Sequence, residues 1–179
     1  MHWIANDYVS KQLTVIAWRF VDEPSKFTRC WALGEVTMRD MLTAFMDFYD
    51  AADIVMGHYV RGHDLPLLNG ALLENGYEPL SDKLTIDTKG DLVNFAGLSK
   101  SQKNLSATLQ VHAEKLDMDQ EMWRQANQLE PQGIAWVKER CISDVNQNIE
   151  LYEAIQGQGF LRPPRWWTSR GTARARYTP

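Results

Sequence analysis

The sequence of 179 residues has little cysteine and no long apolar run. Its two cysteines, Cys30 and Cys141, lie far apart without metal-ligand spacing, which argues against a disulfide framework and predicts two buried thiols in a reducing compartment. The first residues carry neither the basic nor the apolar segment of a secretory signal, and no apolar run approaches membrane-spanning length. These absences favour a soluble, cytoplasmic protein without a membrane partner.

The composition suits one ordinary hydrophobic core, because 44% of the residues are hydrophobic and 11% are aromatic. We therefore expect a single domain over residues 1–160. The net charge of −4 is unevenly distributed: residues 161–179 hold five of the 19 basic residues and no acid, which leaves 14 basic against 23 acidic residues, or −9, for the rest. This asymmetry predicts an acidic body that holds cations and a flexible basic tail that approaches a polyanion. The alternative is a tail that is merely solvated.

The first third of the chain predicts a hairpin followed by a helix. Residues 13–21 are β-branched and aromatic with apolar side chains on both alternating faces, which is typical of an interior strand. Residues 22–25 have turn chemistry, and alternation over 27–33 predicts the second strand. Beyond Gly34 the period changes to that of a helix, with Thr37 as its N-cap.

The middle of the chain predicts strand, helix and strand. A short strand at residues 54–56 ends in Gly-His, and a polar loop leads to a helix that begins at Asp64 and stops at Gly76. Another short strand at 84–88 ends in the polar pair Asp87-Thr88. Polar groups thus gather where a strand C-terminus meets a helix N-terminus, which is where open α/β sheets keep their binding sites.

The remaining elements are predicted to be helical. Asn104 is expected to cap a short helix, and the charged residues 115–130 suggest a helical lid or insertion. A long helix follows Pro131, after which the glycines at 157 and 159 are expected to lead the chain out of the fold.

Two aspartates stand out as candidate site residues. Asp64 opens a helix just after the Gly-His loop, although helix N-capping is a purely structural alternative. Asp144 shares one face of the last helix with Cys141 and Asn148. A carboxylate beside the buried stripe needs a basic partner, a good set of hydrogen bonds or a metal, unless it is a boundary residue turned to solvent.

Four short segments in this order resemble the ribonuclease-H-like 3′–5′ exonucleases of the proofreading type, especially the stand-alone forms of bacteriophages. Residues 57–64 look like the family's Gly-His-Asn loop followed by Phe-Asp, with Tyr59 in place of Asn and His63 in place of Phe. Asp87-Thr88 looks like the Asp-Thr pair that ends the next strand. Residues 104–109 and 140–145 resemble the following helix and the third motif, whose aspartate is a metal ligand.

The resemblance implies an α/β fold with a ribonuclease-H-like mixed sheet flanked by helices, and hydrolysis of DNA or RNA ends with two Mg²⁺ or Mn²⁺ ions. Asp64, Asp144 and His58 would be catalytic, and Asp64, Asp144 and Asp87 would hold metal. The residues expected to contact nucleic acid, with single-stranded DNA ends as the expected partner, are Arg61, His63, Arg140, Arg165, Trp166, Trp167 and Arg170.

Two departures from the family pattern bear on activity. The first motif, Asp-x-Glu on an opening strand, is absent before Leu13, and Arg140 and Glu139 occupy the positions of the usual Tyr or His of the third motif. Three hypotheses follow: an exonuclease whose opening strand lies upstream of Met1, a non-catalytic relative that binds nucleic acid or a protein, and a sheet completed by a strand from a partner chain.

Two residue groups have alternative interpretations. His58 and His63 could bind zinc, but neither cysteine is near in sequence, and His58 can instead form a structural hydrogen bond at the strand end. Trp166 and Trp167 could stack on unpaired bases, or the tail could fold back onto the body.

Overall fold

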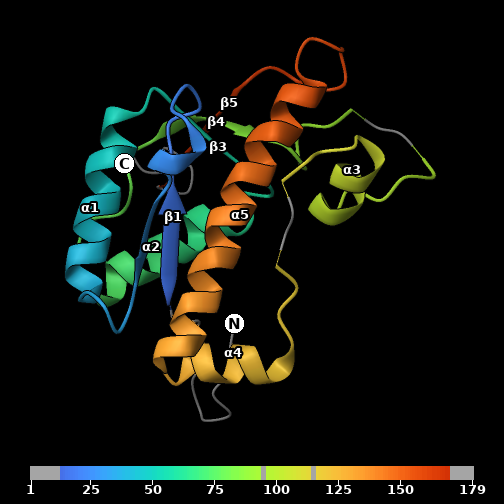
Figure 1. Cartoon of the computed structure of the whole chain (residues 1–179). Helices are drawn as coiled ribbons and strands as arrows, with labels where there is room; N and C mark the ends of the chain where they lie inside the picture. The colour runs from blue at the N-terminus through green and yellow to red at the C-terminus, as the bar shows by residue number, and fades with distance from the viewer. Residues whose placement is uncertain (1–12, 94–95, 114–115, 170–179) are drawn as a thin grey trace, which may run out of the picture.

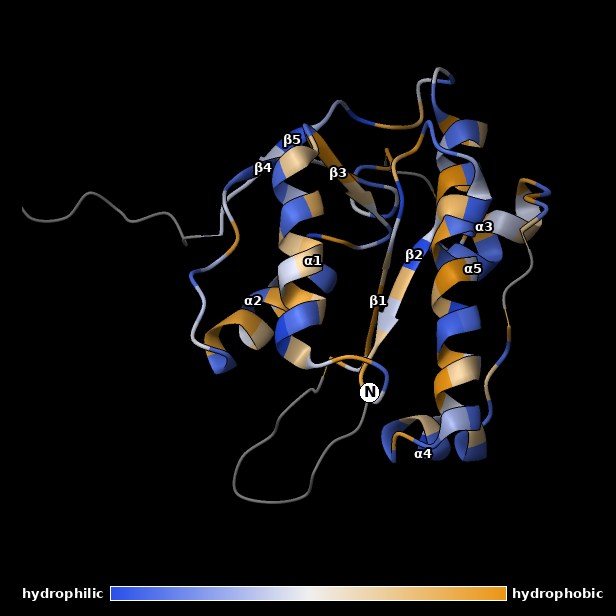
Figure 2. Cartoon of the chain, turned by 60° about the vertical axis from the view of Figure 1, so that its left-hand side comes forward, coloured by the Kyte–Doolittle hydropathy of each residue, from blue (hydrophilic) through white to orange (hydrophobic). Residues whose placement is uncertain are grey.

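The computed structural model describes residues 13–93, 96–113 and 116–169, and these form a mixed α/β arrangement of two small sheets and five α-helices (Figure 1). Helices α1 and α2 lie on one side of the first hairpin, and the long helix α5 lies on the other (Figures 1 and 2). In this part of the chain no helix combines the length and apolar character needed to cross a membrane.

The first sheet is the predicted hairpin. Strand β1 (Val15–Trp18) pairs antiparallel with β2 (Arg29–Ala32), and the connection contains the 3-10 turn η1 (Ser25–Phe27). Among the described residues β1 pairs only with β2, so the second neighbour expected of an interior strand is not among them. Its two faces are nevertheless covered, by α1 and by α5. The apolar pattern therefore reflects the helices that cover the two faces of β1, and it does not require a paired strand at each of its edges.

Helix α1 (Met38–Ala51) begins where its cap predicts. The Thr37 hydroxyl accepts the N–H of Asp40 at 3.1 Å, which satisfies a donor of the first turn. Met41 and Leu42 are fully buried in the main core, and Phe45 meets the ring of Trp18 edge-on at 5.8 Å between centroids.

The second sheet has the strand order β3-β4-β5. Strand β3 (Ile54–Gly57) runs parallel to β4 (Lys83–Asp87), and α2 (Asp64–Glu74) connects them. Strand β5 (Arg165–Trp167) pairs antiparallel with the other edge of β4. The prediction that the chain leaves the fold after Gly159 is therefore wrong for these residues, and Trp167 packs against the main core. Arg170 and the rest of the predicted tail lie outside the described residues.

The later helices match their predicted places with shifted boundaries. Helix α3 (Gln102–Thr108) is capped by Ser101, which accepts the N–H of Asn104, so the predicted cap at Asn104 is wrong by one turn. Helix α4 (Gln120–Asn127) is shorter than expected, and α5 (Pro131–Ile155) is the predicted long helix. The two pack closely at Gly133, where an added Cβ would lie 2.2 Å from the backbone nitrogen of Ala126.

Two buried carboxylates tie the second sheet to the loop that follows β3. Asp87 Oδ1 accepts the N–H groups of Tyr59, Lys89 and Gly90 at 2.8–3.0 Å. Asp91 is fully buried; its Oδ2 accepts the N–H of Asp87, and its Oδ1 is paired with the guanidinium groups of Arg61 and Arg165. Asp91 therefore joins the loop, β4 and β5 at one point.

Replacing Asp91 by Asn should destabilise the protein strongly, because it removes the charge that compensates the largely buried Arg61 guanidinium. Loss of one partner of a buried ion pair costs about 3–5 kcal/mol of unfolding free energy. Urea unfolding followed by circular dichroism would measure it. The matched control is Lys103→Ala, which breaks an exposed pair with Asp117 and should cost no more than about 1 kcal/mol. Equal losses in the two variants would contradict this role of Asp91.

The same carboxylate should make stability depend on acid pH. Burial by itself raises the pKa of Asp91, but hydrogen bonds from Arg61, the Asp87 N–H and Arg165 outweigh it and hold the pKa below its ordinary value of 3.8. The unfolded chain therefore takes up this proton first as pH falls. The stabilisation is complete above the unfolded pKa and is lost as pH falls through the folded pKa. Urea midpoints measured below about pH 5 should fall less steeply for Asp91→Asn than for the native chain; parallel curves would contradict the assignment.

Candidate functional site

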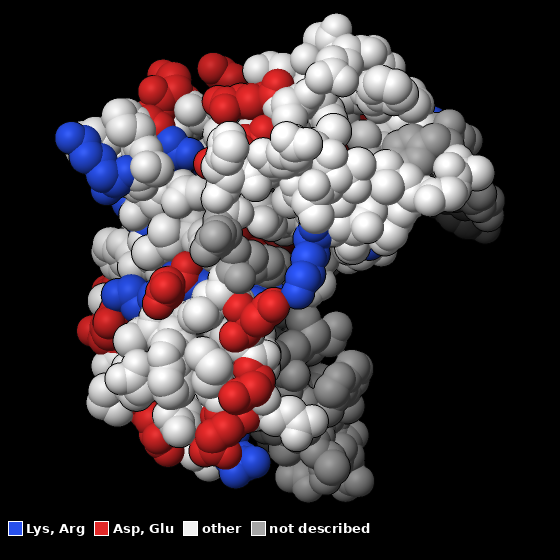
Figure 3. Space-filling model, turned by 45° about the vertical axis from the view of Figure 1, so that its right-hand side comes forward, with Lys and Arg blue, Asp and Glu red and all other residues white. Residues whose placement is uncertain are grey.

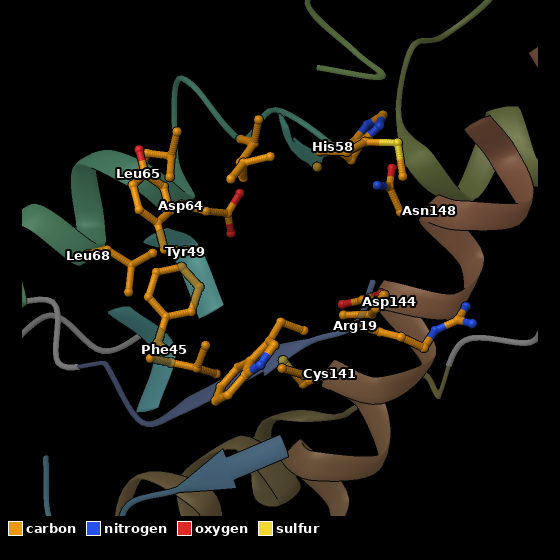
Figure 4. A pocket seen from close by; sticks show the side chains of 18 of the residues that line it. Arg19, Phe45, Tyr49, His58, Asp64, Leu65, Leu68, Cys141, Asp144 and Asn148 are labelled. Carbon is orange, nitrogen blue, oxygen red and sulfur yellow. The ribbon is translucent and has the colours of Figure 1, made fainter. Parts of the chain in front are cut away.

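A cavity of about 480 Å³ lies between the hairpin and β3. Its lining comes from six elements: β1, α1, β3, the first turns of α2, the first residue of α3 and the middle of α5. Most of the lining is apolar, and the polar groups that face it are few (Figure 4). The polar and charged lining residues discussed below are Arg19, His58, His63, Asp64, Asp144 and Asn148.

Asp64 reaches the cavity from the first turn of α2. The residue in the N-cap position is His63, and no side chain caps this helix, so the capping alternative for Asp64 does not describe the structure. The Asp64 carboxylate is 53% exposed and lies 3.5 Å from Nδ1 of His63. Desolvation by the surrounding protein raises the pKa of Asp64, against the opposing effect of His63.

Asp144 reaches the same cavity from α5, on the side opposite Asp64 (Figure 4). Its carboxylate lies 4.0 Å from Nε of Arg140, one turn earlier, so it has the basic partner that its position predicted. Cys141 also lines the cavity. Burial raises the pKa of the Cys141 thiol, with Asp144 and Asp64 adding to the effect, so this thiol is neutral and is not an activated nucleophile.

His58 stands at the end of β3 in a short hydrogen-bonded chain. Its Nδ1 lies 3.1 Å from the Thr88 hydroxyl, and that hydroxyl donates to Oδ1 of Asn148 at 2.6 Å. With the Thr88 proton directed to Asn148, the hydroxyl oxygen accepts from His58, which places the proton of a neutral imidazole on Nδ1. The structural hydrogen bond expected for His58 is therefore present, and its ring lies at the cavity beside Asn148 (Figure 4).

Asp87 is not placed as a metal ligand, contrary to the prediction from sequence. Its side chain is buried behind the loop, outside the cavity lining, and both carboxylate oxygens accept backbone N–H groups. Gly90 leaves little room for another group, because an added Cβ would lie 3.1 Å from the Asp87 carboxyl carbon. This carboxylate orders the chain around it.

Several residues expected to contact nucleic acid have structural partners instead. The largely buried Arg61 binds Asp91 and the Thr85 hydroxyl, and Arg165 binds Asp91. Arg140 donates to the carbonyl of Leu116, and its guanidinium lies 5.7 Å from the Trp123 ring. The charge of Arg61 is neutralised by Asp91 inside the protein, so this arginine is poorly placed to meet a polyanion.

The exposed members of that set among the described residues are His63, Arg165 and Trp166, although Arg165 is also paired with Asp91. The side chain of His63 is 44% exposed, and Trp166 is 69% exposed on β5. Acidic side chains predominate over basic ones on the face drawn in Figure 3, so that face offers no broad basic surface to a nucleic acid.

Asp91 was missed by the sequence analysis although it organises this region. The local signal is the run Asp87-Thr88-Lys89-Gly90-Asp91, in which two carboxylates flank a tight turn. Trp18 and Arg19 were also missed as lining residues, and the indole Nε1 of Trp18 and Nε of Arg19 are buried without a hydrogen-bond partner among the described residues.

The described residues do not make a complete metal site. They contain no group of three or more His, Cys, Asp or Glu side chains arranged to hold a metal ion, which applies equally to zinc at His58 and His63 and to divalent cations at the aspartates. Asp64 and Asp144 would supply two carboxylates from opposite sides, short of the set that two ions require.

Comparison with protein-family models, curated proteins and solved structures finds no match to this chain.

The two tryptophans of β5 should separate a binding role from a structural one. Trp166→Ala removes an exposed ring and should change unfolding free energy by no more than about 0.5 kcal/mol. If single-stranded DNA stacks there, the same change should weaken its binding by about 1–3 kcal/mol, largely independent of salt. Trp167→Ala is the matched control and should cost up to about 3 kcal/mol of stability, since that ring packs against the core. Fluorescence anisotropy with an oligonucleotide and urea unfolding measure the two effects; unchanged DNA affinity for Trp166→Ala would contradict a stacking role.

Proposed function

We propose that this chain is a metal-dependent 3′–5′ exonuclease with a ribonuclease-H-like fold. It would hydrolyse phosphodiester bonds at DNA or RNA ends in the cytoplasm. The observation that carries the proposal is that Asp64 and Asp144, which lie on different helices, face one cavity with His58 at the end of β3. Both aspartates belong to segments that resemble acidic motifs of that family.

The arrangement of elements also supports the proposal. A hairpin comes first, two parallel strands joined by a helix follow, and a long last helix carries the second aspartate. The parallel strands end at the loop that carries His58 and leads to Asp64, which is the edge where α/β sheets bind ligands.

The chemistry requires more oxygen ligands than the described residues bring together. Two divalent ions about 4 Å apart would activate water and relieve charge on the attacking and leaving oxygens. Asp64 and Asp144 are suited to such ions because Mg²⁺ and Mn²⁺ prefer carboxylate oxygen. In the related family an Asp-x-Glu pair supplies the missing carboxylates, and residues 13–93, 96–113 and 116–169 contain no counterpart in this cavity.

A non-catalytic module is the second candidate, and the shortage of metal ligands favours it. Such a module would use the same cavity to bind nucleic acid or a protein without hydrolysing anything. The two candidates differ in whether supplying the missing carboxylates creates activity.

Residues 1–179 should degrade 3′-labelled single-stranded DNA slowly or not at all with Mg²⁺ or Mn²⁺, whereas a version extended upstream by a strand with Asp-x-Glu should be active. In the extended protein, Asp64→Asn and Asp144→Asn should each lower the rate by roughly 10²-fold or more, the usual cost of removing a preorganised electrostatic group. Gel analysis of product lengths over time measures the rate and shows the direction of digestion.

The matched control is Asp47→Asn in the extended protein, because Asp47 is an exposed carboxylate of α1 outside the cavity lining. It should leave the rate unchanged. An extended protein that binds the cations but does not cleave would favour the non-catalytic module. Vigorous cleavage by residues 1–179 that Asp64→Asn leaves intact would contradict the proposed site.

A further inference from the structure

A hydrogen-bonded chain of three side chains ends at the cavity, and its two inner members have no part in the function proposed so far. His58 follows β3, Thr88 follows β4, and Asn148 lies on α5, one turn beyond Asp144 (Figure 4). Thr88 is fully buried and Asn148 is 7% exposed. Three elements that are distant in sequence therefore meet at the His58 ring.

The hydrogen bonds of this chain run in one direction. The Thr88 hydroxyl has a single proton and lies 2.6 Å from Oδ1 of Asn148, against 3.5 Å from the Gly57 carbonyl. The shorter contact receives the proton, because hydroxyl hydrogen bonds are best formed at about 2.7 Å. The hydroxyl oxygen then accepts from Nδ1 of His58, 3.1 Å away. A neutral imidazole carries one such proton, so Nε2 bears the lone pair.

The backbone holds the ring end of this chain in place. Thr88 N–H donates to the Gly57 carbonyl at 3.0 Å, which fixes the residue that precedes His58. A Cβ added at Gly57 would lie 2.7 Å from Cβ of Val60, so the loop closes tightly at this point. Asp87, which precedes Thr88, accepts backbone N–H groups of the same loop. The ring is therefore oriented by contacts that need no ligand, as a preorganised group requires.

The polar groups of the cavity consequently select a donor. Nδ1 of His58 is committed to Thr88, so Nε2 is the ring nitrogen that acts on a group in the cavity, and it accepts. The carboxylates of Asp64 and Asp144 are acceptors in the same space. A water molecule or a hydroxyl group suits such a set, whereas an ionised phosphate oxygen brings no proton to Nε2.

We propose that Thr88 and Asn148 are positioning residues that hold neutral His58 with its proton on Nδ1, and that Nε2 takes the proton of the water that attacks the phosphodiester. The water O–H bond breaks as the Nε2–H bond forms, and the water oxygen bonds to phosphorus. The bond from phosphorus to the 3′ oxygen of the neighbouring nucleotide breaks, and that oxygen takes a proton from solvent. His58 afterwards returns its proton to solvent. The inference rests on the proposed function, but the tautomer is measurable without catalysis.

The tautomer is tested on residues 1–179 with a magnetic nitrogen isotope in the histidine rings. Nuclear magnetic resonance separates protonated from unprotonated ring nitrogens by chemical shift, and the spectrum of His58→Gln identifies the signals of His58. At a pH raised until these signals stop changing, Nδ1 should be protonated and Nε2 unprotonated. A protonated Nε2 in the native chain would overturn the proposal.

Two variants interrupt the chain at different links. Thr88→Val removes the hydroxyl but keeps the shape of the side chain and the backbone N–H bond to Gly57. The tautomers of His58 should then mix, so that its two nitrogen signals move toward one another, and Thr88→Ser should restore the native pattern. Asn148→Leu leaves the hydroxyl proton to turn toward His58 and should also mix the tautomers, so the test stands if one variant fails to fold.

The matched control is Thr85→Val, because Thr85 is as fully buried as Thr88 and its hydroxyl bonds Arg61 instead of His58. It should leave the His58 signals unchanged. An unchanged His58 spectrum in folded Thr88→Val or Asn148→Leu, or an equal change in Thr85→Val, would overturn the positioning role.

The chemical role is tested in the protein extended upstream by a strand with Asp-x-Glu. His58→Gln should lower kcat by roughly 10²–10⁴-fold with little change in KM, the usual contribution of a general base. Thr88→Val should lower kcat by a smaller factor, and Thr88→Ser should recover it. Native kcat in His58→Gln would overturn the base and leave the nuclease standing. An inactive extended protein would overturn the nuclease and the base together, whatever tautomer residues 1–179 show.

Discussion

The buried carboxylate of Asp91 is the interaction on which the second half of the structure depends. It accepts from the backbone of Asp87 and pairs with Arg61 and Arg165, which come from the loop after β3 and from β5. Without a partner, the charges of Asp91 and the largely buried Arg61 would face a large desolvation cost on entering the protein. The loop that carries His58 to the cavity is therefore held by the same contacts that hold β5 in the sheet. Asp87 completes the arrangement through backbone donors of the same loop.

A second constraint is that the described strands form two sheets that do not meet. The hairpin is held by contacts of its faces with α1 and α5, and β3-β4-β5 is held by its own ladder and by the Asp91 contacts. The backbone groups of Val15, Ala17, Ile54 and Met56 are directed into the space between. Open edges of this kind are avoided in natural sheets because they recruit other strands.

The same space unites the two proposals. Asp64 and Asp144 face it from opposite sides, and the metal chemistry of a nuclease needs further carboxylates near them. His58 reaches it from the loop after β3, held by Thr88 and Asn148.

The sequence by itself determined the local elements, because each depends on residues close together in the chain. Turn chemistry and alternation located the hairpin, the Thr37 cap located the start of α1, and spacing of three and four placed Asp144 on the buried side of α5. The tertiary structure decided the rest. Arg61 pairs with Asp91, the Asp87 carboxylate accepts backbone N–H groups, and residues 165–167 pair with β4. Each of these outcomes depends on groups that lie apart in the sequence, so a local pattern does not predict it. The apolar pattern of β1 indicated that both of its faces are covered, as they are by α1 and α5. The pairing of its edges is set by hydrogen bonds between distant segments, which no local pattern encodes.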